Sequence, residues 1–144
     1  IQMNRQKAKI VDIKTKIDQL EKEHSPNIKI AFKHFIRNPT DKVAAHAFEC
    51  AAEQNKAMDM YRIIFATGPK EEYSTYAKQI GIGVSDFEVC MKSGKFNDKI
   101  DNDLSQGLEI GINGTPAFLI QDRLVVGLQP YGVFDKVIGM SKTD

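Results

Sequence analysis

The chain has 144 residues, which is the length of one domain. Folding of a chain of this size buries roughly 70% of the surface that the unfolded chain exposes. Its formal net charge of +1 gives no electrostatic basis for binding nucleic acid or an anionic membrane surface, so we expect no nucleic-acid partner. No apolar run approaches the ~18 residues of a membrane span, so we expect no membrane insertion. The hydrophobic and charged fractions, 42% and 27%, are those of an ordinary globular protein.

The first 40 residues predict a helix followed by a strand. Apolar side chains recur at helical spacing through residues 3–24, and charged side chains fill most of the other positions, which predicts an amphipathic helix packed on a sheet. The sequence Ser-Pro-Asn at 25–27 ends this helix. Residues 28–35 are dense in apolar side chains, as expected of an interior strand. Thr40 or Asp41 is then a natural N-cap for the next helix.

Residues 41 to about 110 predict almost only helix. Glycines and a proline break this stretch, and the resulting segments lie at roughly 41–54, 56–66, 71–80, 84–92 and 96–110. A strand, a long helical crossover and a return to the same sheet indicate α/β architecture.

The loop at 111–116, with the sequence Gly-Ile-Asn-Gly-Thr-Pro, leads into an apolar run at 117–120. A Thr-Pro step directly before a strand fits an X-Pro kink, and we expect this peptide bond to be cis. The polar turn 121–123 and a second apolar run at 124–127 predict a hairpin. Pro130 then begins a helix whose apolar residues follow at helical spacing. These residues are Val133, Phe134, Val137 and Ile138.

Taken together, these segments resemble the bacterial DsbA-type disulfide oxidoreductases, a family with the thioredoxin fold. Residues 111–118 and 126–130 look like the closing strands of that family, and 28–35 looks like its second core strand. Stretches within 44–65 and 76–95 are similar to its inserted helical domain, so the resemblance covers roughly residues 10 to 140. It implies a thioredoxin-like core formed by residues 1–40 and 111–144, with an all-helical domain inserted at 41–110.

One part of the family pattern is missing from the sequence. The family's catalytic Cys-x-x-Cys begins the first core helix after a buried strand, and counting back from Ile28 places it near 6–9. The sequence there is Gln-Lys-Ala-Lys, and no apolar strand precedes it. We therefore expect the first core strand and the cysteine pair to lie upstream of Ile1; the alternatives are a strand supplied by another chain and a remodelled sheet. We assign no catalytic residue in this chain.

The resemblance assigns Gly114, Thr115 and Pro116 as the loop that binds extended substrate segments. It implies protein or peptide substrates with thiols or disulfides, a membrane redox partner, and a periplasmic or otherwise extracytoplasmic location. The implied function is disulfide exchange in exported proteins, inactive in this chain because the cysteine pair is absent. The alternative is a redox-inactive binding or chaperone-like module that uses the groove beside the proline loop. Whether the chain is an enzyme therefore stays open.

Cys50 and Cys90 are the only cysteines and lie on separate predicted helices, so they do not form a Cys-x-x-Cys pair. Three interpretations remain open. The export that the resemblance implies favours a structural disulfide; the others are two buried free thiols and a catalytic or redox-sensing role. His24, His34 and His46 show no metal-ligand spacing, so we expect no metal and no cofactor.

Overall fold

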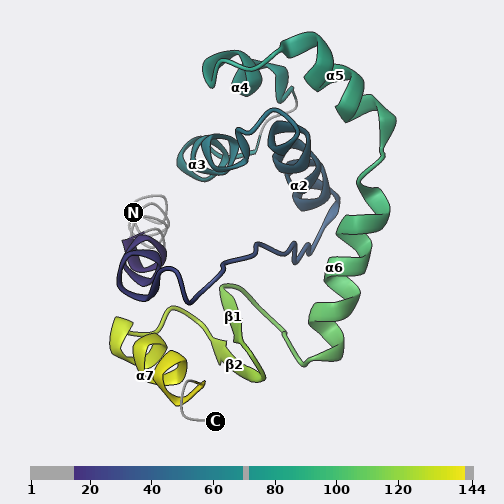
Figure 1. Ribbon diagram of the computed structural model, residues 1–144. Helices are drawn as coiled ribbons and strands as arrows, with labels where there is room; N and C mark the ends of the chain where they lie inside the picture. Colours follow the sequence, from purple (N-terminus) through teal and green to yellow (C-terminus); the bar gives the residue numbers. More distant parts are fainter. Residues whose placement is uncertain (1–14, 70–71, 142–144) are drawn as a thin grey trace. The chain divides into compact units, whose positions relative to one another are not determined.

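The computed structural model describes residues 15–69 and 72–141, and Figure 1 shows the arrangement of their helices and strands. A helix precedes the labelled elements, and its described part covers residues 15–24. The labelled helices are α2 (Pro39–Ala52), α3 (Ala57–Thr67), α4 (Ser74–Gln79), α5 (Val84–Ser93), α6 (Asn97–Glu109) and α7 (Tyr131–Ser141), and the strands are β1 (Ala117–Ile120) and β2 (Arg123–Val126). The helical segments predicted between 41 and 110, the hairpin and the helix after it are confirmed. Among the described residues, no helix is long and apolar enough to span a membrane.

The chain folds as two compact units. Unit 1 comprises residues 1–32 and 107–144, and unit 2 comprises residues 33–106. Each unit has its own buried cluster of apolar side chains.

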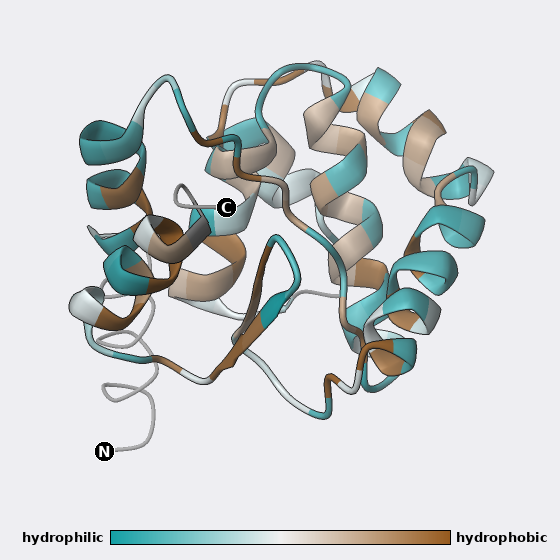
Figure 2. Cartoon of the chain, turned by 60° about the horizontal axis from the view of Figure 1, so that its bottom comes forward, coloured by the Kyte–Doolittle hydropathy of each residue, from teal (hydrophilic) through white to brown (hydrophobic). Residues whose placement is uncertain are grey.

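The hairpin and α7 form the core of unit 1. β1 and β2 pair antiparallel, with Phe118 opposite Val125, and the two residues between the strands form the turn. Figure 2 shows the two apolar strands joined by a hydrophilic turn. Because neighbouring residues of a strand point to opposite faces, Phe118 and Val125 share the face that packs on α7. The rings of Phe118 and Phe134 meet edge to face, with their centroids 4.8 Å apart. The buried residues of this cluster are Leu20, Val125, Phe134 and Ile138.

The strand predicted at 28–35 is wrong. Residues 28–37 have no regular secondary structure, and within the described chain β1 and β2 pair only with each other. Ile28 does pack against the core of unit 1, so apolar density here reports burial rather than strand pairing. The backbone finds other partners: the amide of His34 donates to a carboxylate oxygen of Asp103 instead of to a strand.

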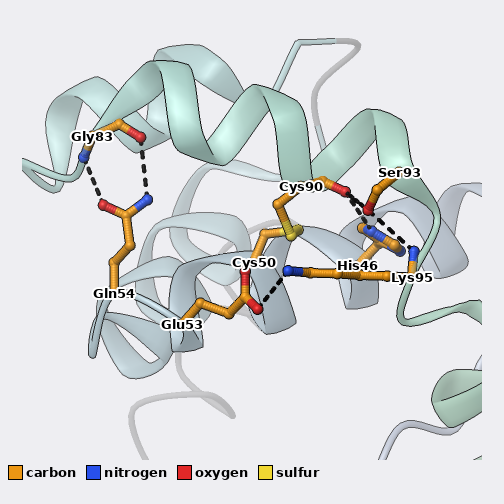
Figure 3. Close-up of a disulfide and its surroundings, with 8 residues drawn as sticks. All are labelled: His46, Cys50, Glu53, Gln54, Gly83, Cys90, Ser93 and Lys95. Atoms are coloured by element: carbon orange, nitrogen blue, oxygen red, sulfur yellow. Dashed lines mark hydrogen bonds and ion pairs between the residues drawn. A yellow bond between two sulfur atoms is a disulfide. The ribbon is translucent and has the colours of Figure 1, made fainter.

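The core of unit 2 lies between α2, α3, α4 and α5. Small side chains on α2, including Ala47 and Ala51, are fully buried and allow the neighbouring helices to approach closely. The other buried members are Cys50, Met60, Tyr73, Tyr76, Ala77, Phe87 and Cys90. The side-chain amide of Gln54 fixes the start of α5, because it accepts from Gly83 N at 2.7 Å and donates to Gly83 O at 3.1 Å (Figure 3).

The N-cap of α2 is Asn38, so the prediction of Thr40 or Asp41 is wrong. The Asn38 side chain accepts a hydrogen bond from Asp41 N at 2.9 Å. Pro39 occupies the first turn, where its fixed φ is already helical and its missing amide proton costs nothing. The helix therefore begins at least two residues earlier than the cap prediction requires.

A network of charged side chains ties residues 33–34 to α2 and α6. Its two carboxylates, Glu49 and Asp103, are both buried. His34 Nε2 lies 2.7 Å from Glu49 Oε1, and Lys33 Nζ lies 2.9 Å from Asp103 Oδ1. Lys99 forms ion pairs with both carboxylates. Every buried charge in this network therefore has a partner, as burial in a low-dielectric interior requires.

The Asp103 carboxylate gives the first testable prediction. Burial raises the pKa of Asp103, but the hydrogen bonds from Lys33 and from His34 N and the nearby lysine charges outweigh burial, so its pKa falls below the ordinary 3.8. A lowered pKa in the folded state stabilises the fold above pH 3.8, and this stabilisation is lost as the pH falls through the lowered value. We expect Asp103→Asn to reduce the free energy of unfolding at pH 7 by about 1–3 kcal/mol. As the pH is lowered, the free energy of unfolding of this variant should fall less than that of the wild type.

Urea unfolding at neutral pH and at a series of acid pH values measures both effects. Asp101→Asn is the matched control, because Asp101 lies on the same helix, is exposed and pairs with Lys42 at 2.7 Å. An exposed pair of this kind contributes about 0–1 kcal/mol. Equal losses in the two variants would contradict the role given to Asp103.

Candidate functional site

The loop that contains Gly114, Thr115 and Pro116 connects α6 to β1. Thr115 is exposed, Gly114 and Pro116 are half-buried, and the Thr115–Pro116 peptide bond is cis. Pro116 O accepts a hydrogen bond from Gly127 N at 2.8 Å, one step beyond the pair formed by Ala117 and Val126. Gly127 has a φ of 78°, a conformation that favours glycine. The hairpin thus holds the Pro116 end of the loop.

Thr115 differs from Pro116 in its hydrogen bonding. Within the described part of the chain, the backbone and side chain of Thr115 make no hydrogen bond. The edge of β1 that faces away from β2 also has no strand partner among those residues. Such an edge offers amide and carbonyl groups to an added extended segment.

The second face of the hairpin is apolar and partly uncovered. Leu119 and Val126 are 53% and 45% exposed, and strand alternation places both on the face opposite Phe118. The open edge of β1 and this apolar face together offer backbone hydrogen bonds and apolar contacts. This combination suits an extended peptide segment.

The two cysteines form a disulfide between α2 and α5 (Figure 3). The Cα atoms of Cys50 and Cys90 are 5.8 Å apart, and the residues are 1% and 4% exposed. The sequence left three interpretations of these cysteines open, and the structure agrees with the first, a disulfide. A cysteine that exchanges with a protein substrate must be accessible, and this pair is not. The bridge is therefore a cross-link between two helices of unit 2.

His46 lies beside this disulfide, one helical turn before Cys50. Its Nε2 donates to Cys90 O at 3.2 Å, and Ser93 Oγ donates to the same carbonyl at 2.6 Å. A ring nitrogen of His46 and the two sulfur atoms all lie within 4.8 Å of one another. The sequence shows that His46 and Cys50 share a helix face at four-residue spacing, but it does not show that Cys90 joins them.

A second polar cluster links the helix at 15–24 to α7. His24 Nε2 lies 2.9 Å from Asp135 Oδ1, and the Tyr131 hydroxyl donates to Glu23. Burial and this hydrogen bond raise the pKa of Tyr131 to about 12. The hydrogen bond from Tyr131 and one from Gln19 hold the pKa of Glu23 below its usual range. These contacts pair the helices with one another, so we interpret the cluster as structural.

The sequence positions at which the cysteine pair was expected, residues 6–9, lie outside the described residues. The catalytic geometry of the family therefore has no counterpart in the described structure. The proline loop of the family pattern, in contrast, lies within the described structure, in unit 1.

A profile of the thioredoxin family matches residues 11–139, and the chain belongs to this family. Two solved structures place it near the DsbA-type members. A thioredoxin-like oxidoreductase from Silicibacter pomeroyi DSS-3 superposes with a TM-score of 0.76 at 18% identity, covering 94% of this chain and 78% of that one. The thiol-disulfide exchange protein α-DsbA2 from Wolbachia pipientis gives 0.75 at 25% identity, covering 90% and 73%. The predicted DsbA-like fold, a thioredoxin-like fold with a helical insertion, is confirmed.

The chain is also similar to part of a much longer curated protein. It is 24% identical over 113 residues, or 76% of its length, to the Na⁺/H⁺ antiporter NhaA of Herminiimonas arsenicoxydans. It spans only 18% of the length of that antiporter. The similarity therefore concerns one segment of the antiporter.

The disulfide gives the second testable prediction. We expect thiol titration of the unfolded, unreduced protein to find no free thiol, and titration after reduction to find two. The bridge closes a loop of 40 residues, and the loss of chain entropy in the unfolded state should stabilise the fold by about 3–4 kcal/mol. Urea unfolding of the wild type and of the Cys50→Ala/Cys90→Ala double variant measures this difference. Two titratable thiols before reduction would rule out the bridge.

Proposed function

We propose that this chain is the peptide-binding part of a DsbA-like thiol-disulfide oxidoreductase that acts on exported proteins. In this proposal, residues 1–40 and 111–144 form the thioredoxin-like core, and residues 41–110 form the inserted helical domain. The observation that carries the proposal is the exposed residue Thr115, whose backbone makes no hydrogen bond in the described chain and which lies two residues before the open edge of β1. Membership in the thioredoxin family supports it.

Gly114, Thr115 and Pro116 have a binding role in this proposal. Thr115 offers an amide and a carbonyl that pair with an extended substrate segment, and Pro116 holds the loop against the hairpin through its bond to Gly127. The half-buried Gly114 lets the substrate backbone approach closely, because it has no side chain. A peptide held in this way presents its own cysteine to the redox pair of the enzyme.

The exchange itself needs a cysteine pair that this sequence does not contain. Disulfide exchange proceeds by attack of a thiolate on a disulfide sulfur, through a mixed disulfide. Its attacking thiolate needs an accessible position with a lowered pKa, as at a helix N-terminus. Cys50 and Cys90 are buried and bonded to each other, so the 144 residues alone bind substrate but perform no exchange.

The proposal includes partners and a location. The substrates are proteins or peptides with thiols or disulfides, in line with the similarity to a thiol-disulfide exchange protein. The electrons taken from substrate thiols pass to a membrane redox partner, since each exchange leaves the enzyme pair reduced. The location is periplasmic or otherwise extracytoplasmic, where a disulfide such as Cys50–Cys90 persists.

A second candidate function is a redox-inactive binding or chaperone-like module that uses the same loop. The lack of a Cys-x-x-Cys in the sequence favours it, as does the similarity to a segment of an antiporter. The coding sequence that precedes Ile1 separates the two functions. An apolar strand followed by Cys-x-x-Cys would identify the oxidoreductase, and its absence would identify the binding module.

The third prediction concerns redox activity. We expect the 144-residue protein to reduce insulin at the rate of the buffer control, because its two cysteines are buried in a helix–helix bridge. An insulin-reduction assay monitored by turbidity measures this, with a Cys-x-x-Cys oxidoreductase as the positive control. Turnover above background that is lost in Cys50→Ala would contradict the prediction.

The fourth prediction concerns peptide binding. We expect Thr115→Arg to raise the Kd for a fluorescently labelled, unfolded peptide with an alkylated cysteine by about tenfold or more, equivalent to about 1.4 kcal/mol. The long arginine side chain at this exposed position would obstruct the approach of a peptide to the backbone of residue 115. Fluorescence anisotropy measures the affinity.

Thr67→Arg is the matched control, since Thr67 is also an exposed threonine but lies at the end of α3 in unit 2. Unchanged binding in Thr115→Arg, or an equal loss in both variants, would remove the loop from both candidate functions.

A further inference from the structure

We propose that reduction of the Cys50–Cys90 disulfide creates a zinc site in unit 2, with His46, Cys50 and Cys90 as its ligands. The site belongs to unit 2 and the proline loop to unit 1, and the proposal does not depend on the proposed function. It would give the same three residues two alternative states, a covalent bridge and a metal complex.

The positions of the three residues carry this proposal. His46 and Cys50 lie four residues apart on α2, so they occupy one face of the helix, and Cys90 faces them from α5 (Figure 3). A ring nitrogen of His46 and the two sulfur atoms already lie within 4.8 Å of one another. Two thiolates and one imidazole are a ligand set that zinc binds, and three protein ligands leave its fourth position open.

The hydrogen bond of His46 fixes which ring nitrogen carries the proton. A carbonyl oxygen only accepts, so Nε2 carries the proton in the bond to Cys90 O, at 3.2 Å. In the neutral ring, Nδ1 then holds a lone pair. Metal-binding histidines usually donate their other ring nitrogen to a carbonyl or carboxylate, which fixes the tautomer and the ring orientation. The ring of Phe96 also contacts His46 edge-on, with the centroids 5.7 Å apart.

Distance and charge both suit a zinc ion. Tetrahedral coordination with Zn–S bonds of about 2.3 Å places two sulfur atoms about 3.8 Å apart. Side-chain rotation after reduction can reach this separation, because the Cα atoms lie 5.8 Å apart. Zn²⁺ with two thiolates and a neutral imidazole has no net charge. This matters because His46, Cys50 and Cys90 are 5%, 1% and 4% exposed, and an uncompensated charge there would be costly.

The chemical balance is complete with a dithiol as the reductant. The dithiol gives two electrons and two protons to the bridge and becomes a disulfide, while Cys50 and Cys90 become thiols. Zn²⁺ then displaces two protons from these thiols and forms two Zn–S bonds and one Zn–N bond. A small-molecule disulfide reoxidises the pair: it takes two electrons from the thiolates and two protons from water, becomes two thiols, and the Cys50–Cys90 bond forms as the ion is released.

Zinc binding by the intact 144-residue protein tests this inference. We expect the reduced protein, freed of reductant under nitrogen, to take one Zn²⁺ per chain from a chromophoric chelator, and the oxidised protein to take none. Co²⁺ in place of zinc should give the near-ultraviolet charge-transfer band of thiolate ligands in the reduced protein only. Failure of the reduced protein to bind zinc would overturn the proposal.

Two variants separate the site from general metal binding by exposed groups. His46→Asn should weaken zinc binding more than about tenfold, since loss of a hydrogen-bonding partner of a ligand already costs about 10–100-fold and this variant loses the ligand itself. His34→Asn removes a histidine of unit 2 that bonds Glu49 instead, so its zinc affinity should match the wild type. Wild-type affinity in His46→Asn would overturn the assignment.

Circular dichroism provides the readout if reduction loosens the fold. Zinc should raise the melting temperature of the reduced protein and leave that of the oxidised protein unchanged, because a ligand that binds only the folded state stabilises it. A reduced protein that stays unfolded in the presence of zinc would also count against the site.

Discussion

Helix α2 occupies the interior of unit 2, and most of that unit depends on how closely its neighbours approach it. Its buried residues are Ala45, His46, Ala47, Glu49, Cys50 and Ala51. Alanine side chains leave room for close packing, so the cysteines reach bonding distance across α2 and α5. Larger side chains at these positions would force the helices apart, because a closely packed interior tolerates little added volume. The bridge and the three-residue cluster around it are both products of this approach.

The polar residues of α2 face a different problem, because the same burial that favours alanine penalises charge. Glu49 is compensated by His34 and Lys99, and the neighbouring Asp103 by Lys33 and Lys99. These partners come from the irregular segment before α2 and from α6. The network therefore positions a stretch of backbone that no strand pairing holds. It also explains why residues 33–37 belong to unit 2.

The sequence predicted local structure well where glycine and proline mark the ends of elements. Gly68, Gly81, Gly94 and Pro130 lie at or next to helix ends, and the apolar runs around 121–122 pair as a hairpin. The strand at 28–35 was wrong because apolar density reports burial, whereas a strand also needs a hydrogen-bonding partner. The proline loop was visible through its Thr-Pro step. The contact of His46 with Cys90 was not, because it joins residues 44 positions apart.

Helix α5 is held at its beginning by the amide of Gln54, just after α2, and near its end by the disulfide and the hydrogen bond from His46. These attachments enclose α3, α4 and the connections between them. A peptide bond broken anywhere between Cys50 and Cys90 would therefore yield two fragments that remain one covalent molecule. Such a nicked protein would keep α2 and α5 joined, with the sulfur bridge in place of the lost backbone connection.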